Sequence, residues 1–397
     1  MRTAALLLLI AMGACKNEAP KDTPKPALAS PQASAEPAPI AMPLALSARI
    51  SPEGGPPPTP MRGDVALEAE GFGKDLTGYT INVVLRLPDA PAVTTGAPVS
   101  TQAIDAVRKA NEPRFTIDLT ANRMRMQLTS HGFLLARDSE LRSRSDRFGH
   151  VFLTPDLASY RVLAPGALRS LFGERRADVS PLSPADVKII GDGPMRLGYH
   201  TRKAEVNSRA GKGSFEIVRL PELGDGGALF VRALLDLMNA PPQVSVVGWD
   251  ELPVHAELHW STRGALFFEV TSITKRIDLS STAMAVPPSG ATFVMGALPP
   301  LPGELRTEQK DLSSLHTGAI DPTASSLVLV NVHDTPRFAW IDGAPIAWVA
   351  PEGRLELSPL QRGRYMLEWR TFLDDAGEAP KPFTVPASPQ PADAGAH

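Results

Sequence analysis

The sequence predicts an α+β protein that is mostly antiparallel β-sheet. Apolar and polar residues alternate in many short segments, which is the pattern of half-buried strands. Helical spacing of apolar residues occurs in only a few segments. The predicted strands also follow one another along the chain with few helices between them, which favours antiparallel pairing.

The chain begins with a short apolar run that ends at its single cysteine. A positive charge precedes the run at residues 4–12 and two small residues follow it, which is the layout of a secretory signal. A helix of roughly nine residues covers about 14 Å of the roughly 30 Å hydrocarbon layer, so the run is too short to span a membrane. The stretch Met12-Gly13-Ala14-Cys15 resembles the lipobox of bacterial lipoproteins, although leucine is usual where Met12 stands.

The resemblance implies that residues 1–14 are a lipoprotein signal peptide and that Cys15 carries the lipid that binds the protein to a membrane. Lys16 favours the outer membrane, by analogy with enterobacterial lipoproteins. We therefore expect an outer-membrane lipoprotein of the cell envelope that faces the periplasm or the cell surface. Two alternatives remain, a plain signal peptide with an incidental Cys15 and a cytoplasmic protein with an apolar start.

Composition limits the class of protein. Hydrophobic residues make up 43% of the 397 and charged ones 21%, so a large core can form, and the length favours two folded domains. The formal net charge is −3 with no basic block, which argues against nucleic acid as a partner. Residues 15–60 and 387–397 are rich in proline and alanine and lack aromatic residues, so we expect a disordered tether and a disordered tail.

The first folded region is predicted to span residues 61–300. The clearest helix is predicted at 228–238, with a second, weaker one at 101–110 and a third at 165–172. The clearest hairpin lies at 254–270, where Val254, Ala256, Leu258 and Trp260 share one face. Strands are predicted at 65–69, 81–87, 115–119, 124–128, 150–153, 160–163, 187–190, 199–206 and 214–220.

The order of these elements resembles the second half of LolA-like lipoprotein carriers. The similar part comprises the strands of "YHTRKAEVNSRAGKGSFEIVRL", the helix that follows, the hairpin and the closing "MAVPPSGATF". The resemblance implies a LolA-like unclosed β-barrel with a few helices, whose concave side can hold acyl chains. We therefore name four candidate lining residues for a hydrophobic ligand: Met126, Leu258, Trp260 and Phe268. Ordinary core packing is the alternative for all four.

After a linker at 301–323, strand alternation resumes at 324–386. A strand ending at Ile341 runs into Asp342-Gly343, which predicts a tight turn. Together with Gly363-Arg364-Tyr365, this stretch resembles the PEGA-type β-module of bacterial surface proteins, although Ala347 stands where that pattern has glycine. The resemblance implies a small β-sandwich that serves as an interaction or spacer unit.

The motifs for catalysis are weak, so we expect no enzyme, no catalytic residue, no metal and no cofactor. His255, Glu257 and His259 alternate along a strand and would need another ligand to hold zinc. His200 and His333 are isolated. The run at 137–147 mixes arginines with acids and is predicted to be an exposed loop, with contact to an anionic head group as the alternative.

We expect a non-enzymatic, membrane-anchored envelope lipoprotein that binds either a lipid or acyl ligand or another envelope protein. One alternative is a purely structural or adhesive tethered protein without a cavity. Another is an unrecognised hydrolase or metal enzyme.

Overall fold

The computed structural model describes residues 73–87, 100–130, 135–146, 150–163, 171, 185–209, 211–237, 247–286, 288–296, 325–360, 363–371, 376, 378–385 and 392–393. Over these ranges the predicted fold class is confirmed: the chain is α+β and mostly antiparallel sheet, and the described strands do not close into a barrel. The same ranges contain two helices, α2 (Thr101–Asn111) and α4 (Gly226–Leu237). Neither of them is long and apolar enough to span a bilayer.

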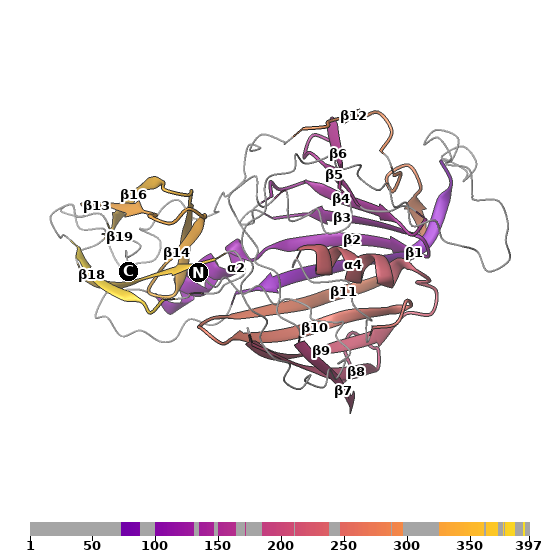
Figure 1. Cartoon of the computed structure of the whole chain (residues 1–397), viewed down its shortest axis with the longest axis horizontal. Helices are drawn as coiled ribbons and strands as arrows, with labels where there is room; N and C mark the ends of the chain where they lie inside the picture. The colour runs from indigo at the N-terminus through magenta and orange to yellow at the C-terminus, as the bar shows by residue number, and fades with distance from the viewer. Residues whose placement is uncertain are drawn as a thin grey trace, which may run out of the picture. The chain divides into compact units, whose positions relative to one another are not determined.

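Twelve strands form the large sheet, in the spatial order β12-β6-β5-β4-β3-β2-β1-β11-β10-β9-β8-β7 (Figure 1). The first strand lies in the middle and pairs antiparallel with both β2 and β11. The strands are β1 (Asp75–Arg86), β2 (Arg114–Thr120), β3 (Arg123–Leu128), β4 (Glu140–Arg144), β5 (His150–Leu153), β6 (Ser159–Leu163), β7 (Ala185–Asp192), β8 (Thr201–Ser208), β9 (Gly211–Arg219), β10 (Glu251–Trp260), β11 (Ala265–Ser280) and β12 (Thr292–Phe293).

The predicted hairpin is β10 and β11. Val254, Ala256, Leu258 and Trp260 are all buried, as their shared face predicts. The backbone N–H of Trp260 donates to the carbonyl of Gly264 at 3.1 Å, and Gly264 has φ +92°, which favours glycine at that position. β11 continues to Ser280 and pairs with the whole of β1, so the sheet is continuous from β7 to β6.

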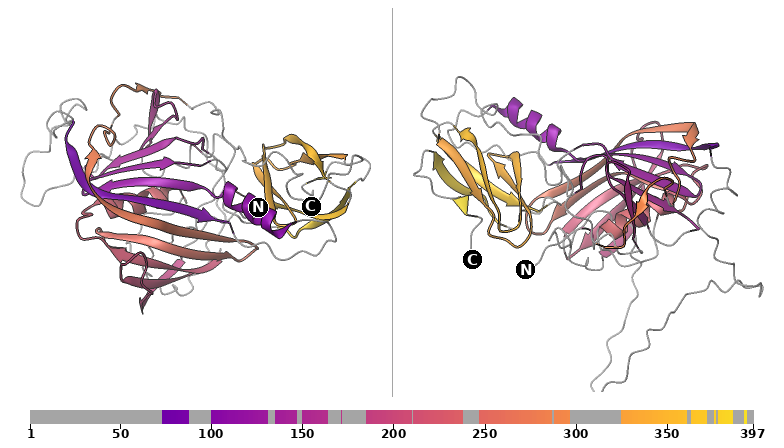
Figure 2. Two further views of the ribbon diagram at one scale, coloured as in Figure 1. Left: turned by 180° about the vertical axis from the view of Figure 1, so that it is seen from behind. Right: turned by 90° about the horizontal axis from the view of Figure 1, so that it is seen from above.

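Helix α4 lies on one side of this sheet, where it contacts β2, β3 and β10 (Figures 1 and 2). Leu229, Phe230 and Ala233 of the helix are almost fully buried. They belong to one cluster with the apolar side chains of the sheet. We call this side of the sheet the apolar face. Because the helix and the strands each bury one apolar side against the other, the sequence shows helical spacing in α4 and period-two alternation in the strands.

Two glycines allow the start of α4 to lie close to both β2 and β10. A Cβ atom on Gly226 would lie 2.3 Å from the carbonyl oxygen of Thr120, at the end of β2. A Cβ on Gly227 would lie 2.5 Å from the carbonyl oxygen of Trp249, just before β10. Because both obstacles are backbone atoms, the helix start is held between β2 and β10 only with glycine at these positions.

The prediction of an exposed loop at 137–147 is wrong, because Glu140–Arg144 form β4 and all five residues are buried. The segment that follows β11 covers the opposite, polar face of the sheet here. Arg142 donates to the carbonyl oxygen of Ala285 at 3.3 Å, and Val286 packs with Val151 and Leu153. When one face of a strand carries charged residues, the alternation in the sequence is the same whether that face is exposed or covered by another segment.

Two small sheets share a core near the C-terminus, with the orders β16-β13-β19 and β15-β14-β17-β18. The predicted Asp-Gly turn is confirmed, with φ +48° at Asp342 and +81° at Gly343. Ile104 and Val107 of α2 belong to the same apolar cluster. The strands are β13 (Ser325–Val330), β14 (Arg337–Ile341), β15 (Ala344–Val349), β16 (Arg354–Leu360), β17 (Gly363–Arg370), β18 (Lys381–Val385) and β19 (Ala392–Asp393).

Several predictions fall on residues outside the described ranges. They include Cys15 and its signal, the tether, the strand at 65–69 and the linker at 301–323. The predicted helix at 165–172 also lies outside these ranges except for Leu171. These interpretations stay predictions.

Candidate functional site

The four candidate lining residues all lie in the single cluster on the apolar face. Met126 is on β3, Leu258 and Trp260 are on β10, and Phe268 is on β11. Their exposed fractions are 7%, 5%, 6% and 1% in that order. Residues of β3, β10 and β11 thus belong to one buried cluster, and their role as ligand contacts stays a prediction.

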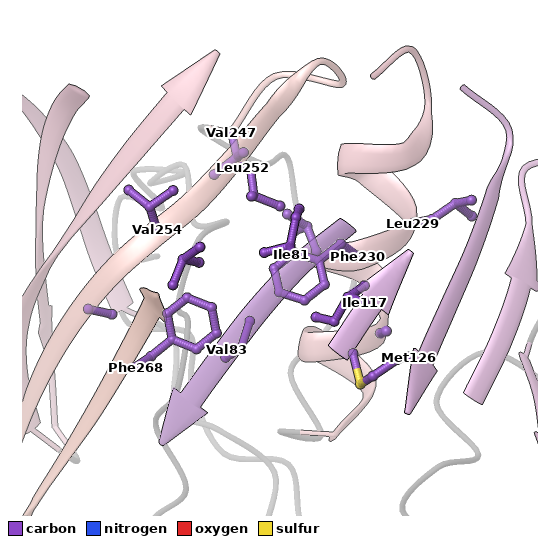
Figure 3. Packing of buried hydrophobic residues seen from close by; sticks show 14 of the residues in the cluster. Ile81, Val83, Ile117, Met126, Leu229, Phe230, Val247, Leu252, Val254 and Phe268 are labelled. Carbon is purple, nitrogen blue, oxygen red and sulfur yellow. The ribbon is translucent and has the colours of Figure 1, made fainter. Parts of the chain in front are cut away.

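Side chains of α4 occupy the space in front of this surface. The rings of Phe230 and Phe268 are 6.2 Å apart between centroids and tilted by 40°. Figure 3 shows Phe230 and Phe268 directed toward the same region as Ile81 and Val83, with Met126 farther along the sheet. Aromatic pairs at this separation are ordinary core contacts. Phe268 and Met126 are thus parts of a packed core.

The polar face carries hydrogen-bonded side chains that link neighbouring strands. Arg196 holds Glu216 of β9 in a bidentate pair at 2.6 and 3.2 Å. Arg86 of β1 holds Glu269 of β11 by a short ion pair. His255 of β10 stands between them, because it lies opposite Glu216 on one side and Glu269 on the other. This face therefore carries charged side chains that pair across neighbouring strands.

The possible zinc ligands lie together but do not form a site. His255, Glu257 and His259 share the polar face as predicted, and His255 Nε2 is 3.4 Å from Glu257 Oε1. His259 instead has its ring edge against Phe267, at 5.9 Å between centroids. In the ranges that the structure describes, no group of three or more histidine, cysteine, aspartate or glutamate side chains could hold a metal ion.

A buried charge cluster on β3 and β4 was not predicted from the sequence. Glu140, 1% exposed, receives hydrogen bonds from Arg125 Nε at 3.0 Å and from Arg142 Nε at 2.8 Å. Burial alone would raise the pKa of Glu140, but the hydrogen bonds and charges of the two arginines outweigh it and lower the pKa. Arg125 also reaches Asp118 on β2 at 3.2 Å. The cluster links three strands by charge-assisted hydrogen bonds.

Ser143 and His150 form another buried pair that was not predicted. Ser143 Oγ lies 2.5 Å from His150 Nδ1, and both side chains are about 1% exposed. The spacing is that of a nucleophile and a base. A substrate cannot reach a pair so deeply buried, so we assign it to packing between β4 and β5. His200 is exposed, and His333 lies in the segment between β13 and β14.

No family model and no curated protein matches the chain. Among solved structures, the chain is similar to MucB in complex with periplasmic MucA, with 11% identity and a TM-score of 0.27, over 74% of this chain and 70% of that one. It is also similar to PNGF-II, with 10% identity and a TM-score of 0.28, over 67% of this chain and 46% of that one. At these TM-scores neither likeness carries an argument about function.

Proposed function

We propose that the chain is a non-enzymatic, lipid-anchored protein of a bacterial envelope that binds another envelope protein. Cys15 anchors the chain to a membrane, and Lys16 at the next position favours the outer membrane. The region 61–300 and the module at 324–386 follow the tether in the sequence, and their surfaces bind the partner. The lipobox resemblance supports the anchor, and the PEGA-type resemblance supports an interaction module.

The observation that favours a protein partner over an acyl ligand is the packing of the apolar face. A carrier of acyl chains needs an apolar cavity of roughly 300 Å³ or more. The residues that would line it are instead at most 7% exposed, and Phe268 has Phe230 of α4 against it. The polar face carries charged side chains, which opposite charges on a partner protein can match.

Native mass spectrometry of the full chain with Cys15 replaced by serine distinguishes the two kinds of partner. The substitution removes the covalent lipid, so any remaining lipid mass is a bound ligand. We expect the mass of the polypeptide alone after purification without detergent. Copurifying fatty acid or phospholipid at stoichiometric occupancy would overturn the protein-binding proposal in favour of a lipid carrier.

A second variant makes the result specific to the apolar face. Met126→Trp adds volume where a ligand would lie. If the Cys15→Ser chain carries lipid and the Met126→Trp version of it does not, the ligand occupies the apolar face. If both carry none, the packed core is supported.

A further inference from the structure

Exposed apolar side chains gather at one end of the large sheet. We call it the entry end: β1 begins there at Asp75, and β11 ends beside it at Ser280. Because the pairing is antiparallel, β10 and β8 also begin at this end, and β9 and β7 end there. Four large apolar residues of this end are exposed: Met195 by 54%, Leu197 by 44%, Trp249 by 67% and Ile277 by 74%.

These residues lie on short segments that are close to one another. Met195 and Leu197 are in the turn between β7 and β8, Trp249 precedes β10, and Ile277 is near the end of β11. The Lys275 ammonium pairs with Glu222 at 2.7 Å, which joins the end of β11 to the segment after β9. Burial raises the pKa of Tyr79, and the nearby Glu222 and Tyr199 raise it further, which places the β7–β8 turn near β1.

The loop that carries Trp249 is held firmly while its ring is exposed. The N–H of Leu220 donates to the carbonyl of Asp250 at 2.8 Å, and the N–H of Gly248 donates to Glu251 Oε2 at 2.6 Å. The Trp249 carbonyl lies against the start of α4 at Gly227. An exposed tryptophan on a braced loop is a large apolar surface that costs little entropy to bury.

Three ion pairs lie at this end. Arg219 pairs with Asp250 at 2.6 Å and Arg276 with Asp278 at 2.7 Å, in addition to Lys275 with Glu222. The surface therefore offers apolar side chains between neutralised charges. This chemistry matches the interfacial layer of a bilayer, where tryptophan is enriched.

The described chain also enters at this end, at Gly73, roughly 60 residues after Cys15; a flexible chain of that length averages about 40 Å end to end. We infer that the entry end, through Met195, Leu197, Trp249 and Ile277, rests on the surface of the bilayer to which Cys15 is anchored. The inference rests on the proposed anchor.

Tryptophan quenching by brominated lipid tests this contact. The chain has five tryptophans, and the other four are between 0% and 8% exposed, so Trp249 is the one that lipid can reach. The full chain, purified from membranes, is reconstituted into vesicles of phosphatidylethanolamine and phosphatidylglycerol with brominated acyl chains. We expect quenching that grows with the brominated fraction, is unchanged by salt and is absent from Trp249→Phe.

Two exposed positions provide a matched pair of variants. Ile277→Asp should remove most of the quenching, because it places a charge in the contact. Met295→Asp should leave it unchanged, since Met295 is 87% exposed but follows β12, the edge strand on the far side of the sheet from β10, β9 and β8. Both changes are at the surface, so both variants should fold.

The failure of the contact and the failure of the anchor give different results. If the chain floats with the vesicles but Trp249 is not quenched, the anchor holds and the inferred contact is wrong. If the chain does not float, the anchor is wrong and the contact that rests on it falls as well. Equal quenching in the Ile277→Asp and Met295→Asp variants would also overturn the assignment of this surface.

Discussion

Phe268→Ala should destabilise the large sheet by about 3–5 kcal/mol, because it removes a ring that is 1% exposed from the centre of the core. The cavity would lie between β11 and α4, where Phe230 loses its aromatic neighbour. Hydrogen exchange along β10, β11 and α4 measures the effect. Peptides from β14 to β17 serve as an internal reference.

Phe267→Ala is the matched control. Phe267 directly precedes Phe268 on β11 and points to the polar face, where it is partly exposed and lies against His259. We expect a change of less than about 1 kcal/mol, as for other partly exposed positions. Equal losses in the two variants would show that the apolar face is not the packed side of the sheet.

Glu140→Gln should cost about 3–5 kcal/mol, because it leaves the half-buried Arg125 and the buried Arg142 without the carboxylate that both of them bond. Glutamine keeps the size of the side chain, so the loss reports charge and hydrogen bonding. Asp278→Asn removes an exposed carboxylate from its pair with Arg276 and should cost less than about 1 kcal/mol. Denaturant unfolding at neutral pH compares the two variants.

The loss in Glu140→Gln should also depend on pH. Since the pKa of Glu140 is lowered from its ordinary value of 4.5, the ionised carboxylate stabilises the folded state above that value. This stabilisation is lost as the pH falls through the lowered pKa. The difference between parent and variant should therefore be constant above about pH 5 and shrink in more acidic solution. A constant difference down to pH 3 would contradict the role of the ion pairs.

The sequence predicted the fold class and most strands because period-two alternation follows directly from one face being buried. The hairpin of β10 and β11 and the Asp342-Gly343 turn are the clearest examples, since each combines alternation with a local turn signal. The same alternation placed Met126, Leu258 and Phe268 on the apolar side of their strands, where all three are buried in one cluster. It could not show that α4 would fill the space in front of them.

β4 was missed for a physical reason. The sequence pattern predicts that the arginines of β4 are exposed. They are instead buried by a segment that follows β11, more than 100 residues later in the chain. Such a contact leaves no local signal, and a stretch of alternating charges usually indicates a solvated surface. The pairing of Ser143 with His150 is likewise a product of cross-strand register rather than of any motif.

The central claim, that Cys15 is the membrane anchor, is tested most directly by the intact mass of the protein taken from membranes and denatured. We predict a chain that starts at Cys15 and carries the added mass of a diacylglyceryl group and an amide-linked acyl chain. A chain that retains residues 1–14, or one that has a free Cys15 thiol, would contradict the account.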